Sequence, residues 1–146
     1  MSNYATDFYT WTQTQAQALR AKDWAAVDIE HVAEEIADLG QSIENAIDSQ
    51  LIRILFHLLK LREDPGSRAR RGWMVSIDDS RERITRHLRR NPGLRHRPEE
   101  RLPDAYRQAR RRAALALGRP LTAFPESCPW PVAQVLDEDF WPEAQP

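Results

Sequence analysis

The longest regular pattern of hydrophobic and polar positions in the chain runs from residue 28 to residue 61. Hydrophobic residues recur there every three or four positions, which places them on one face of an α-helix. No proline occurs in residues 1–64, so the pattern predicts either one long helix or two helices that meet near Gly40. The members of this stripe are Ile29, Val32, Ile36, Leu39, Ile43, Ile47, Leu51, Ile54 and Leu58.

The stripe also predicts where the core lies. Residues 51–61 are hydrophobic on nearly every side, which is typical of a helix in the middle of a bundle. Asp28 can cap the first turn. Gly40 costs a helix about 1 kcal/mol relative to alanine, so we expect it to permit close helix packing or to mark a break. Trp24, just before this region, is expected to be a buried anchor. The expected core residues are Ile36, Ile43, Ile47, Leu51, Ile54 and Leu58.

Three further helices are predicted on either side of this region. The first runs from about residue 6 or 7 to residue 21, and the others span about residues 67–90 and 102–117. Pro103 fits the first turn of the last of these helices, where a backbone N–H is not needed. Gly118 is placed to end that helix in a left-handed conformation.

The end of the chain has a different composition. Five prolines occur among four aromatic residues in residues 120–142. So many prolines exclude a long helix, while the aromatic content argues against disorder. We expect a strap that packs over the helices, with one helical turn at Val132 to Leu136 and its acidic residues near the basic middle of the chain. The predicted fold class is therefore all-α: a single domain, residues 1–146, with a bundle of about four main helices (1–118) and an irregular proline and aromatic C-terminal strap (119–146).

Charge divides the chain into three parts, although the net charge is only −1. Residues 1–61 carry 4 basic and 9 acidic side chains, residues 62–112 carry 16 and 8, and residues 113–146 carry 1 and 5. Arginine accounts for 19 of the 21 basic residues. Because arginine binds carboxylate and phosphate alike, the basic middle is compatible with nucleic acid, with an acidic partner, or with the chain's own acidic ends.

Four segments together carry a resemblance to a known family. They are DFYTWTQTQAQALR near the start, DIEHVAEEIADLG in the long helical region, ILFHLLKL at residues 54–61, and FPESCPWPVAQVLDEDFWPE near the end. Over nearly its whole length, and in the same order, the chain resembles the bacterial family called domain of unknown function 29 (DUF29). The resemblance implies a small all-helical protein with no established activity, and it carries over no catalytic residue. Where the family often has an aromatic residue after the HLLK motif, this chain has Leu61.

One group of side chains has the types that bind a transition metal. His31, Glu34, Glu35 and Asp38 share one helical face, about 140° from the centre of the hydrophobic stripe. Imidazole and carboxylate groups bind zinc, manganese or iron, but bundle metal sites draw inward-pointing ligands from several helices. The ordinary interpretation of this cluster is a solvated charged face.

The arginines of residues 67–112 are the second candidate site. Nucleic-acid binding needs cations aligned with phosphates, and RNA binding adds exposed aromatic residues for stacking. Only Trp73 and Tyr106 alternate with the arginines, and both occupy core-like positions, so ion pairing with acidic protein surfaces is the competing interpretation. The candidate binding residues are Arg83, Arg86, Arg90, Arg107 and Arg111.

Other features narrow the function further. The chain lacks a nucleotide-binding loop, a nucleophile elbow and an HExxH motif, and its single cysteine, Cys128, cannot form an internal disulfide. The start of the chain has no secretory pattern, and the 11-residue hydrophobic run at residues 51–61 is shorter than the roughly 20 residues of a membrane span.

We expect a cytoplasmic protein, without membrane association or cofactor, that binds another protein or a second copy of itself. Nucleic-acid binding and a metal-dependent enzyme are the alternatives.

Overall fold

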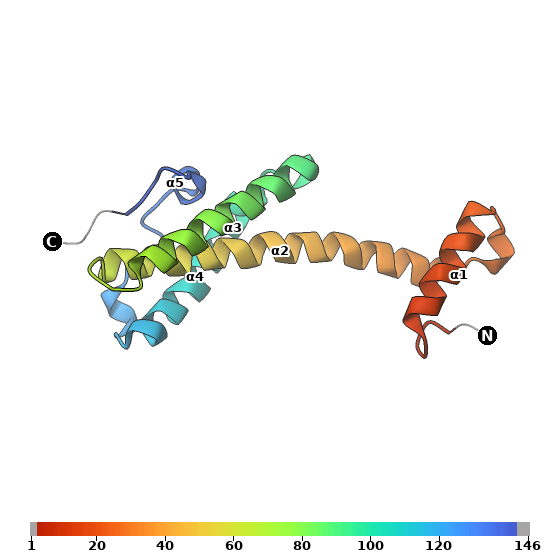
Figure 1. The fold of residues 1–146 in the computed structure, drawn as a ribbon, viewed down its shortest axis with the longest axis horizontal. Helices are drawn as coiled ribbons and strands as arrows, with labels where there is room; N and C mark the ends of the chain where they lie inside the picture. The colour runs from red at the N-terminus through yellow and green to blue at the C-terminus, as the bar shows by residue number, and fades with distance from the viewer. Residues whose placement is uncertain (1–2, 143–146) are drawn as a thin grey trace. The chain divides into compact units, whose positions relative to one another are not determined.

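The computed structural model describes residues 3–142 and contains helices and turns, with no strand among these residues (Figure 1). This confirms the all-α prediction. None of the helices between residues 3 and 142 combines the length and hydrophobicity that a bilayer-spanning segment requires. The main helices are α1 (Phe8–Arg20), α2 (Ile29–Glu63), α3 (Arg70–Arg90) and α4 (Arg97–Leu117), with the short helix α5 (Val132–Leu136) and the 3-10 turns η1 (Trp24–Ala26), η2 (Pro92–Leu94) and η3 (Leu121–Ala123).

The chain forms two compact units, Met1–Ser42 and Ile43–Pro146. Helix α2 is continuous from one unit into the next, which settles the choice between one long helix and two. A Cβ atom built at Gly40 meets nothing within 4 Å, so this glycine neither permits close packing nor breaks the helix, and both expectations for it were wrong. That all 146 residues form a single domain stays a prediction.

In the first unit, the buried Gln15 of α1 holds the start of α2 in place. Its Nε2 atom donates to the carbonyl of Ala26 at 3.2 Å, and its Oε1 atom accepts from the backbone N–H of Asp28 at 2.6 Å. Asp28 then caps α2, because its Oδ1 atom accepts from the backbone N–H of His31 at 3.4 Å. These bonds satisfy backbone groups that a helix start would otherwise leave unpaired.

Aromatic rings form the centre of the first unit. The Tyr4 ring stacks on the His31 ring with centroids 4.0 Å apart and meets the Trp11 ring edge-on at 4.8 Å. Trp11 is buried, whereas Trp24 is 62% exposed. The prediction that Trp24 is a buried anchor was therefore wrong, because Trp11 and Tyr4 already fill the centre of this unit.

The second unit contains the main hydrophobic core. Ile47, Leu51, Ile54 and Leu58 of α2 are all fully buried, as the periodicity predicts. Side chains from α3, α4 and the C-terminal strap join the later part of α2 in one cluster, and among them are Ile77, Ile84, Ala105, Tyr106, Ala109, Phe124 and Trp130.

Helix α4 begins earlier than predicted. It starts at Arg97 with Pro98 in its first turn, so Pro103 lies inside the helix rather than in its first turn. The predicted end is confirmed, since Gly118 adopts the left-handed conformation with φ of 63°. The backbone N–H of Arg119 donates to the carbonyl of Ala114 at 3.0 Å, which closes the last turn.

The C-terminal strap packs onto the second unit as predicted, over residues 119–142. Phe124 and Trp130 are buried, and the helical turn at Val132–Leu136 is present. Tyr106 donates its hydroxyl hydrogen to the carbonyl of Pro125. Residues 143–146 of the predicted strap lie outside the described residues.

Candidate functional site

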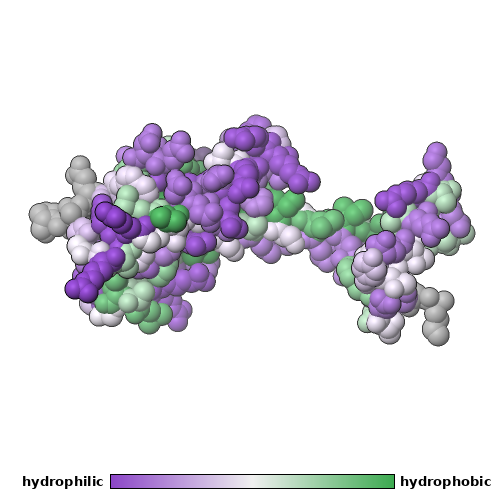
Figure 2. All heavy atoms as spheres, viewed as in Figure 1, coloured by the Kyte–Doolittle hydropathy of each residue, from purple (hydrophilic) through white to green (hydrophobic). Residues whose placement is uncertain are grey.

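A row of large hydrophobic side chains is exposed on the part of α2 that belongs to the first unit. Ile29, Ile36 and Leu39 are 69%, 63% and 67% exposed, and they lie within about 80° of one another around the helix. Figure 2 shows hydrophobic residues, in green, uncovered along α2. The prediction that Ile36 is a core residue was therefore wrong, and Ile43 is only half-buried. We call Ile29, Ile36 and Leu39 the exposed stripe.

The exposed stripe is open because the first unit packs on another side of α2. His31 and Glu35 lie about 140° and 100° from Ile36 around the helix. The Tyr4 ring covers His31, and the Tyr4 hydroxyl donates to a carboxylate oxygen of Glu35. The residues before and within α1 thus bind the polar side of α2 and leave the hydrophobic side uncovered.

The predicted metal cluster is part of this polar packing. His31 Nδ1 lies 2.7 Å from Asp28 Oδ2, and this bond raises the pKa of His31 and lowers that of Asp28. The hydrogen bond to Glu35 raises the pKa of Tyr4 to about 12. Within residues 3–142 no three His, Cys, Asp or Glu side chains gather in an arrangement that could hold a metal ion. The remaining members of the predicted cluster, Glu34 and Asp38, are exposed.

Three of the five candidate arginines pair with an acidic residue of their own helix. The Nε atom of Arg83 donates to Asp79 at 2.9 Å, Arg86 lies 3.9 Å from Glu82, and Arg107 lies 3.1 Å from Asp104. The other two, Arg90 and Arg111, are exposed and have no ion pair within the part of the chain that the structure describes. The structure therefore does not bring the five together as one free cationic surface.

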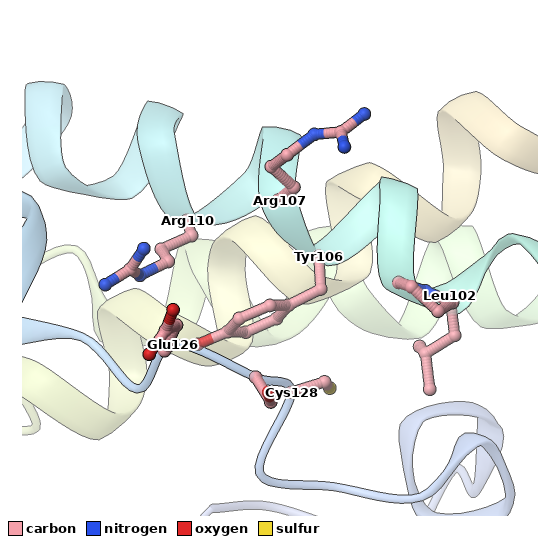
Figure 3. A pocket seen from close by; sticks show the side chains of 8 residues that line it. Leu102, Tyr106, Arg107, Arg110, Glu126 and Cys128 are labelled. Carbon is pink, nitrogen blue, oxygen red and sulfur yellow. The ribbon is translucent and has the colours of Figure 1, made fainter.

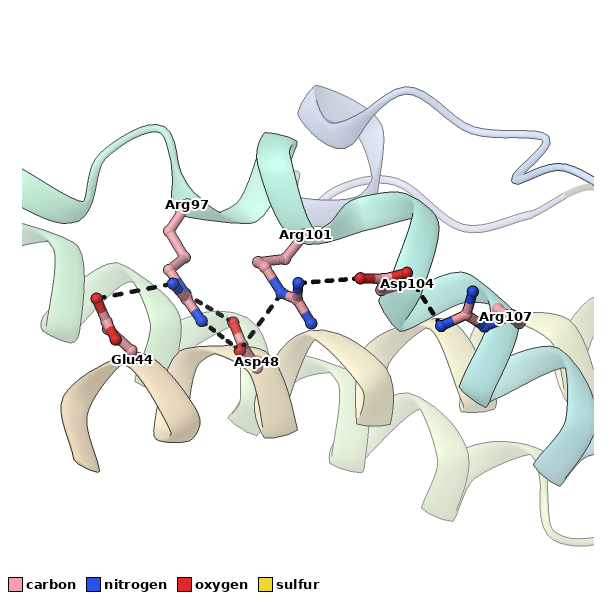
Figure 4. A network of polar contacts seen from close by, with 6 residues as sticks. All are labelled: Glu44, Asp48, Arg97, Arg101, Asp104 and Arg107. Atoms are coloured by element: carbon pink, nitrogen blue, oxygen red, sulfur yellow. Dashed lines mark hydrogen bonds and ion pairs between the residues drawn. The ribbon is translucent and has the colours of Figure 1, made fainter. Parts of the chain in front are cut away.

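A network of arginines and carboxylates links α2 to α4 inside the second unit (Figure 4). Arg97 binds both carboxylate oxygens of Asp48, at 3.0 and 2.6 Å, and lies 3.7 Å from Glu44. Arg101 lies 3.5 Å from Asp48 and 2.9 Å from Asp104. The two-pronged contact uses the geometry that arginine offers to a carboxylate. Part of the basic middle of the chain is thus paired internally.

A pocket of about 550 Å³ lies between α4 and the strap (Figure 3). Leu102 and Tyr106 provide hydrophobic surface, and Arg110 and Glu126 provide opposite charges. Cys128 also lines the pocket, but burial raises the pKa of its thiol and its Sγ atom bonds to the carbonyl of Trp130 at 3.3 Å. A thiol acts as a nucleophile in its ionised form, so this environment opposes nucleophilic catalysis by Cys128.

The family model described as "Domain of unknown function DUF29" matches residues 3–141, nearly the whole chain. The chain belongs to the DUF29 family. Comparison with curated proteins and with solved structures found no match. The description of DUF29 assigns no function, so the function has to be argued from the residues themselves.

The structure of this DUF29 chain gives buried roles to charged residues that sequence reasoning passed over. Arg81 is buried, and its Nε atom donates to the carbonyl of Val135 at 2.9 Å while its guanidinium lies 5.1 Å from the centre of the Trp141 ring. Lys60 is buried as well, with its ammonium 4.1 Å from the Phe56 ring. Arg81 has the spacing of the core face of α3, four residues after Ile77 and three before Ile84, and Lys60 lies within the hydrophobic run 51–61. These positions were the signal in the sequence that could have predicted their burial.

Proposed function

We propose that this DUF29 protein is a protein-binding module of the cytoplasm and that the exposed stripe of α2 is its binding face. The observation that supports this most directly is the exposure of three large hydrophobic side chains on one face of a regular helix. Surface hydrophobic residues scattered singly need no explanation, whereas contiguous ones usually mark an interaction site. The first unit has its own buried residues on α1, including Trp11 and Gln15, so the stripe is not required for its core.

The size of the stripe sets the expected strength of binding. Burial of one isoleucine or leucine side chain contributes about 1.5–3 kcal/mol, and association itself costs at least about 4 kcal/mol. Three such side chains can therefore support a moderate, reversible complex, and they supply the hydrophobic centre that an interface needs.

Site-specific photo-cross-linking tests this function. A photoreactive phenylalanine analogue placed at Ile36 should give a cross-linked protein adduct in a cell lysate, and Leu39→Asp in the same chain should abolish it. The same analogue placed at Val75, an exposed hydrophobic residue of α3, serves as the matched control and should give no such adduct. Equal adducts at both positions, or none at Ile36, would contradict the proposal.

Nucleic-acid binding through α3 and α4 is the second candidate. The observation in its favour is that Arg90 and Arg111 are exposed and form no ion pair with any residue between 3 and 142. The internal pairs of Arg83, Arg86 and Arg107 weigh against it. A gel-shift series with duplex and single-stranded probes at increasing salt distinguishes the two functions. Binding with a steep salt dependence that Arg90→Ala and Arg111→Ala reduce would favour this second function, and an absence of binding at low salt would exclude it.

A further inference from the structure

The charged residues around the exposed stripe have one sign. Between Trp24 and Ser42 the chain has no lysine or arginine, and it has five carboxylates: Asp28, Glu30, Glu34, Glu35 and Asp38. His31, bonded to Asp28, offsets at most one of these negative charges. Glu35 and Glu30 lie about 100° and 120° from Ile36 around the helix, and Asp28 directly precedes Ile29, so these three carboxylates flank the exposed stripe. Glu34 and Asp38 lie about 160° from Ile36, on the opposite side of the helix. Two copies of this face laid together would bring the three flanking carboxylates of each copy into one short interface, and like charges placed opposite one another oppose association. A partner that carries lysine and arginine would be attracted instead.

The shape of the exposed stripe and of the small residues beside it suits a helical partner. The exposed stripe extends about 15 Å along the axis of α2, with the three- and four-residue spacing that helical partners match. Ala33 and Gly40 lie about 60° and 40° from Ile36, on one side of the stripe. The space beside Gly40 is open, since a Cβ atom there would meet nothing within 4 Å. Large side chains of a neighbouring helix can fit over these two small residues, as knobs fit into holes.

We propose that the exposed stripe binds an amphipathic helix of another protein whose polar face is rich in lysine and arginine. This inference rests on the proposed function and specifies the chemistry of the partner. The hydrophobic side of the partner helix covers Ile29, Ile36 and Leu39, and its cations lie next to the carboxylates that flank them. The complementary charges fix the partner's identity and register more than its affinity.

Three designed peptides of about 18 residues, long enough for several helical turns, test the proposal with the full chain by fluorescence anisotropy. The basic peptide has leucine at helical spacing and lysine elsewhere. The acidic peptide has glutamate in place of lysine, and the shuffled peptide has the composition of the basic one without the helical spacing. The basic peptide should bind at least about tenfold more tightly than either other peptide, a difference of about 1.4 kcal/mol.

Variants of the protein show whether binding uses the stripe. Ile36→Asp should weaken binding of the basic peptide at least about tenfold, while Ile36→Leu and the control Val75→Asp should leave it within about twofold. Circular dichroism melts should confirm that each variant is folded, since all the changed side chains are exposed.

Each contrary outcome overturns a defined part of the account. If the shuffled peptide binds as tightly as the basic one, or if Ile36→Asp has no effect on binding, the basic peptide binds only through its charge. The helix-binding proposal is then wrong. If the acidic peptide binds better through Ile36, protein binding stands and the partner's chemistry is wrong. If the protein alone sediments as an oligomer that Ile36→Asp dissociates, the occupant is a second copy. Failure of all peptides together with failure of cross-linking at Ile36 removes the proposed function itself.

Discussion

The two parts of helix α2, one in each unit, carry the same periodic row of hydrophobic side chains but differ in whether other elements cover it. Ile36 and Ile54 are 18 residues apart, which is about five helical turns, so they occupy the same angular position on the helix. Ile54 is fully buried in the core of the second unit, whereas Ile36 is 63% exposed in the first. A hydrophobic period therefore identifies a face of a helix but not the element that covers it.

The sequence around each part explains the difference. Residues 51–61 are hydrophobic on nearly all sides, so they must be enclosed by several elements, and α3, α4 and the strap provide the enclosure. Residues 29–42 are hydrophobic on one side only. Their polar side contacts Tyr4, which precedes α1, because Glu35 accepts a hydrogen bond from the Tyr4 hydroxyl and the His31 ring stacks on the Tyr4 ring. One part of α2 is therefore suited to a core, and the other to a surface that a partner can bind.

Removal of the strap should have the largest effect on the second unit. A chain that ends at Gly118 loses Phe124, Trp130 and Val135, whose burial contributes about 1.5–3 kcal/mol for each side chain. We expect a loss of more than about 5 kcal/mol in the free energy of unfolding, or aggregation. Chemical denaturation and light scattering measure both. Limited proteolysis of the full chain is the control: rapid trimming to about residue 118 that leaves an equally stable core would contradict this account of the strap.

Truncation of a single side chain should change the free energy of unfolding by different amounts in the two parts of α2. Leu58→Ala should lower the free energy of unfolding by about 2–5 kcal/mol, because it removes a fully buried side chain and leaves a cavity. Ile36→Ala is the matched change in the exposed part and should cost less than about 0.5 kcal/mol. Urea denaturation of both variants makes the comparison. A similar cost for the two would show that the exposed stripe contributes to the core after all.

Disruption of the network in Figure 4 should have a smaller effect. Asp48→Ala leaves Arg97, a mostly buried arginine, without its two-pronged partner, and we expect a loss of about 1.5–3 kcal/mol. Glu82→Ala is the control, because its pair with Arg86 is long and exposed and such pairs contribute about 0–1 kcal/mol. Equal losses in thermal denaturation would mean that the network has no special role.

Acid should destabilise the second unit through His57. Burial, followed by the nearby Lys60 and Arg53, lowers the pKa of His57 from 6.5 to about 4. Between these two values the unfolded chain binds a proton that the folded chain does not, so stability falls as the pH drops through this window. We expect His57 to account for on the order of 1–2 kcal/mol of that fall, allowing for its partial exposure.

The variant His57→Leu isolates this contribution. It keeps a hydrophobic side chain at the position and removes a ring nitrogen, Nδ1, that is buried without a hydrogen-bond partner among the described residues. Its free energy of unfolding should change less between pH 7 and pH 4.5 than that of the unmodified protein. If the two curves run parallel, His57 is not the group that responds to acid.

Much of the fold could be predicted from local patterns. The period of hydrophobic residues identified the four main helices, and Gly118 and the prolines marked the end of α4 and the character of the strap. The start of α4 could not be found this way, because residues 97–101 carry only charged residues and a proline ahead of Leu102. Helix α4 continues through Pro103 because its other side chains, such as Tyr106, are held in the core.

The candidate site could be predicted only in part. The hydrophobic stripe itself was visible in the sequence, but its exposure at Ile36 depends on the side of α2 to which Tyr4 binds. That side is decided by a hydrogen bond to Glu35 and a ring stacked on His31, and these contacts join residues about 30 positions apart. The burial of Arg81 likewise depends on the strap, which is distant in sequence and has no pattern that points to α3.

The central claim is that the early part of the α2 stripe binds a partner while the later part forms the core. Methyl NMR of the full chain, labelled at isoleucine, leucine and valine and titrated with the basic peptide, tests it most directly. The account predicts that the large chemical-shift changes fall at Ile29, Ile36 and Leu39, with smaller changes at the neighbouring Val32 and Ile43 and none at the buried Ile54. Changes centred instead on exposed residues of the second unit, such as Val75, Leu115 and Leu121, would contradict it.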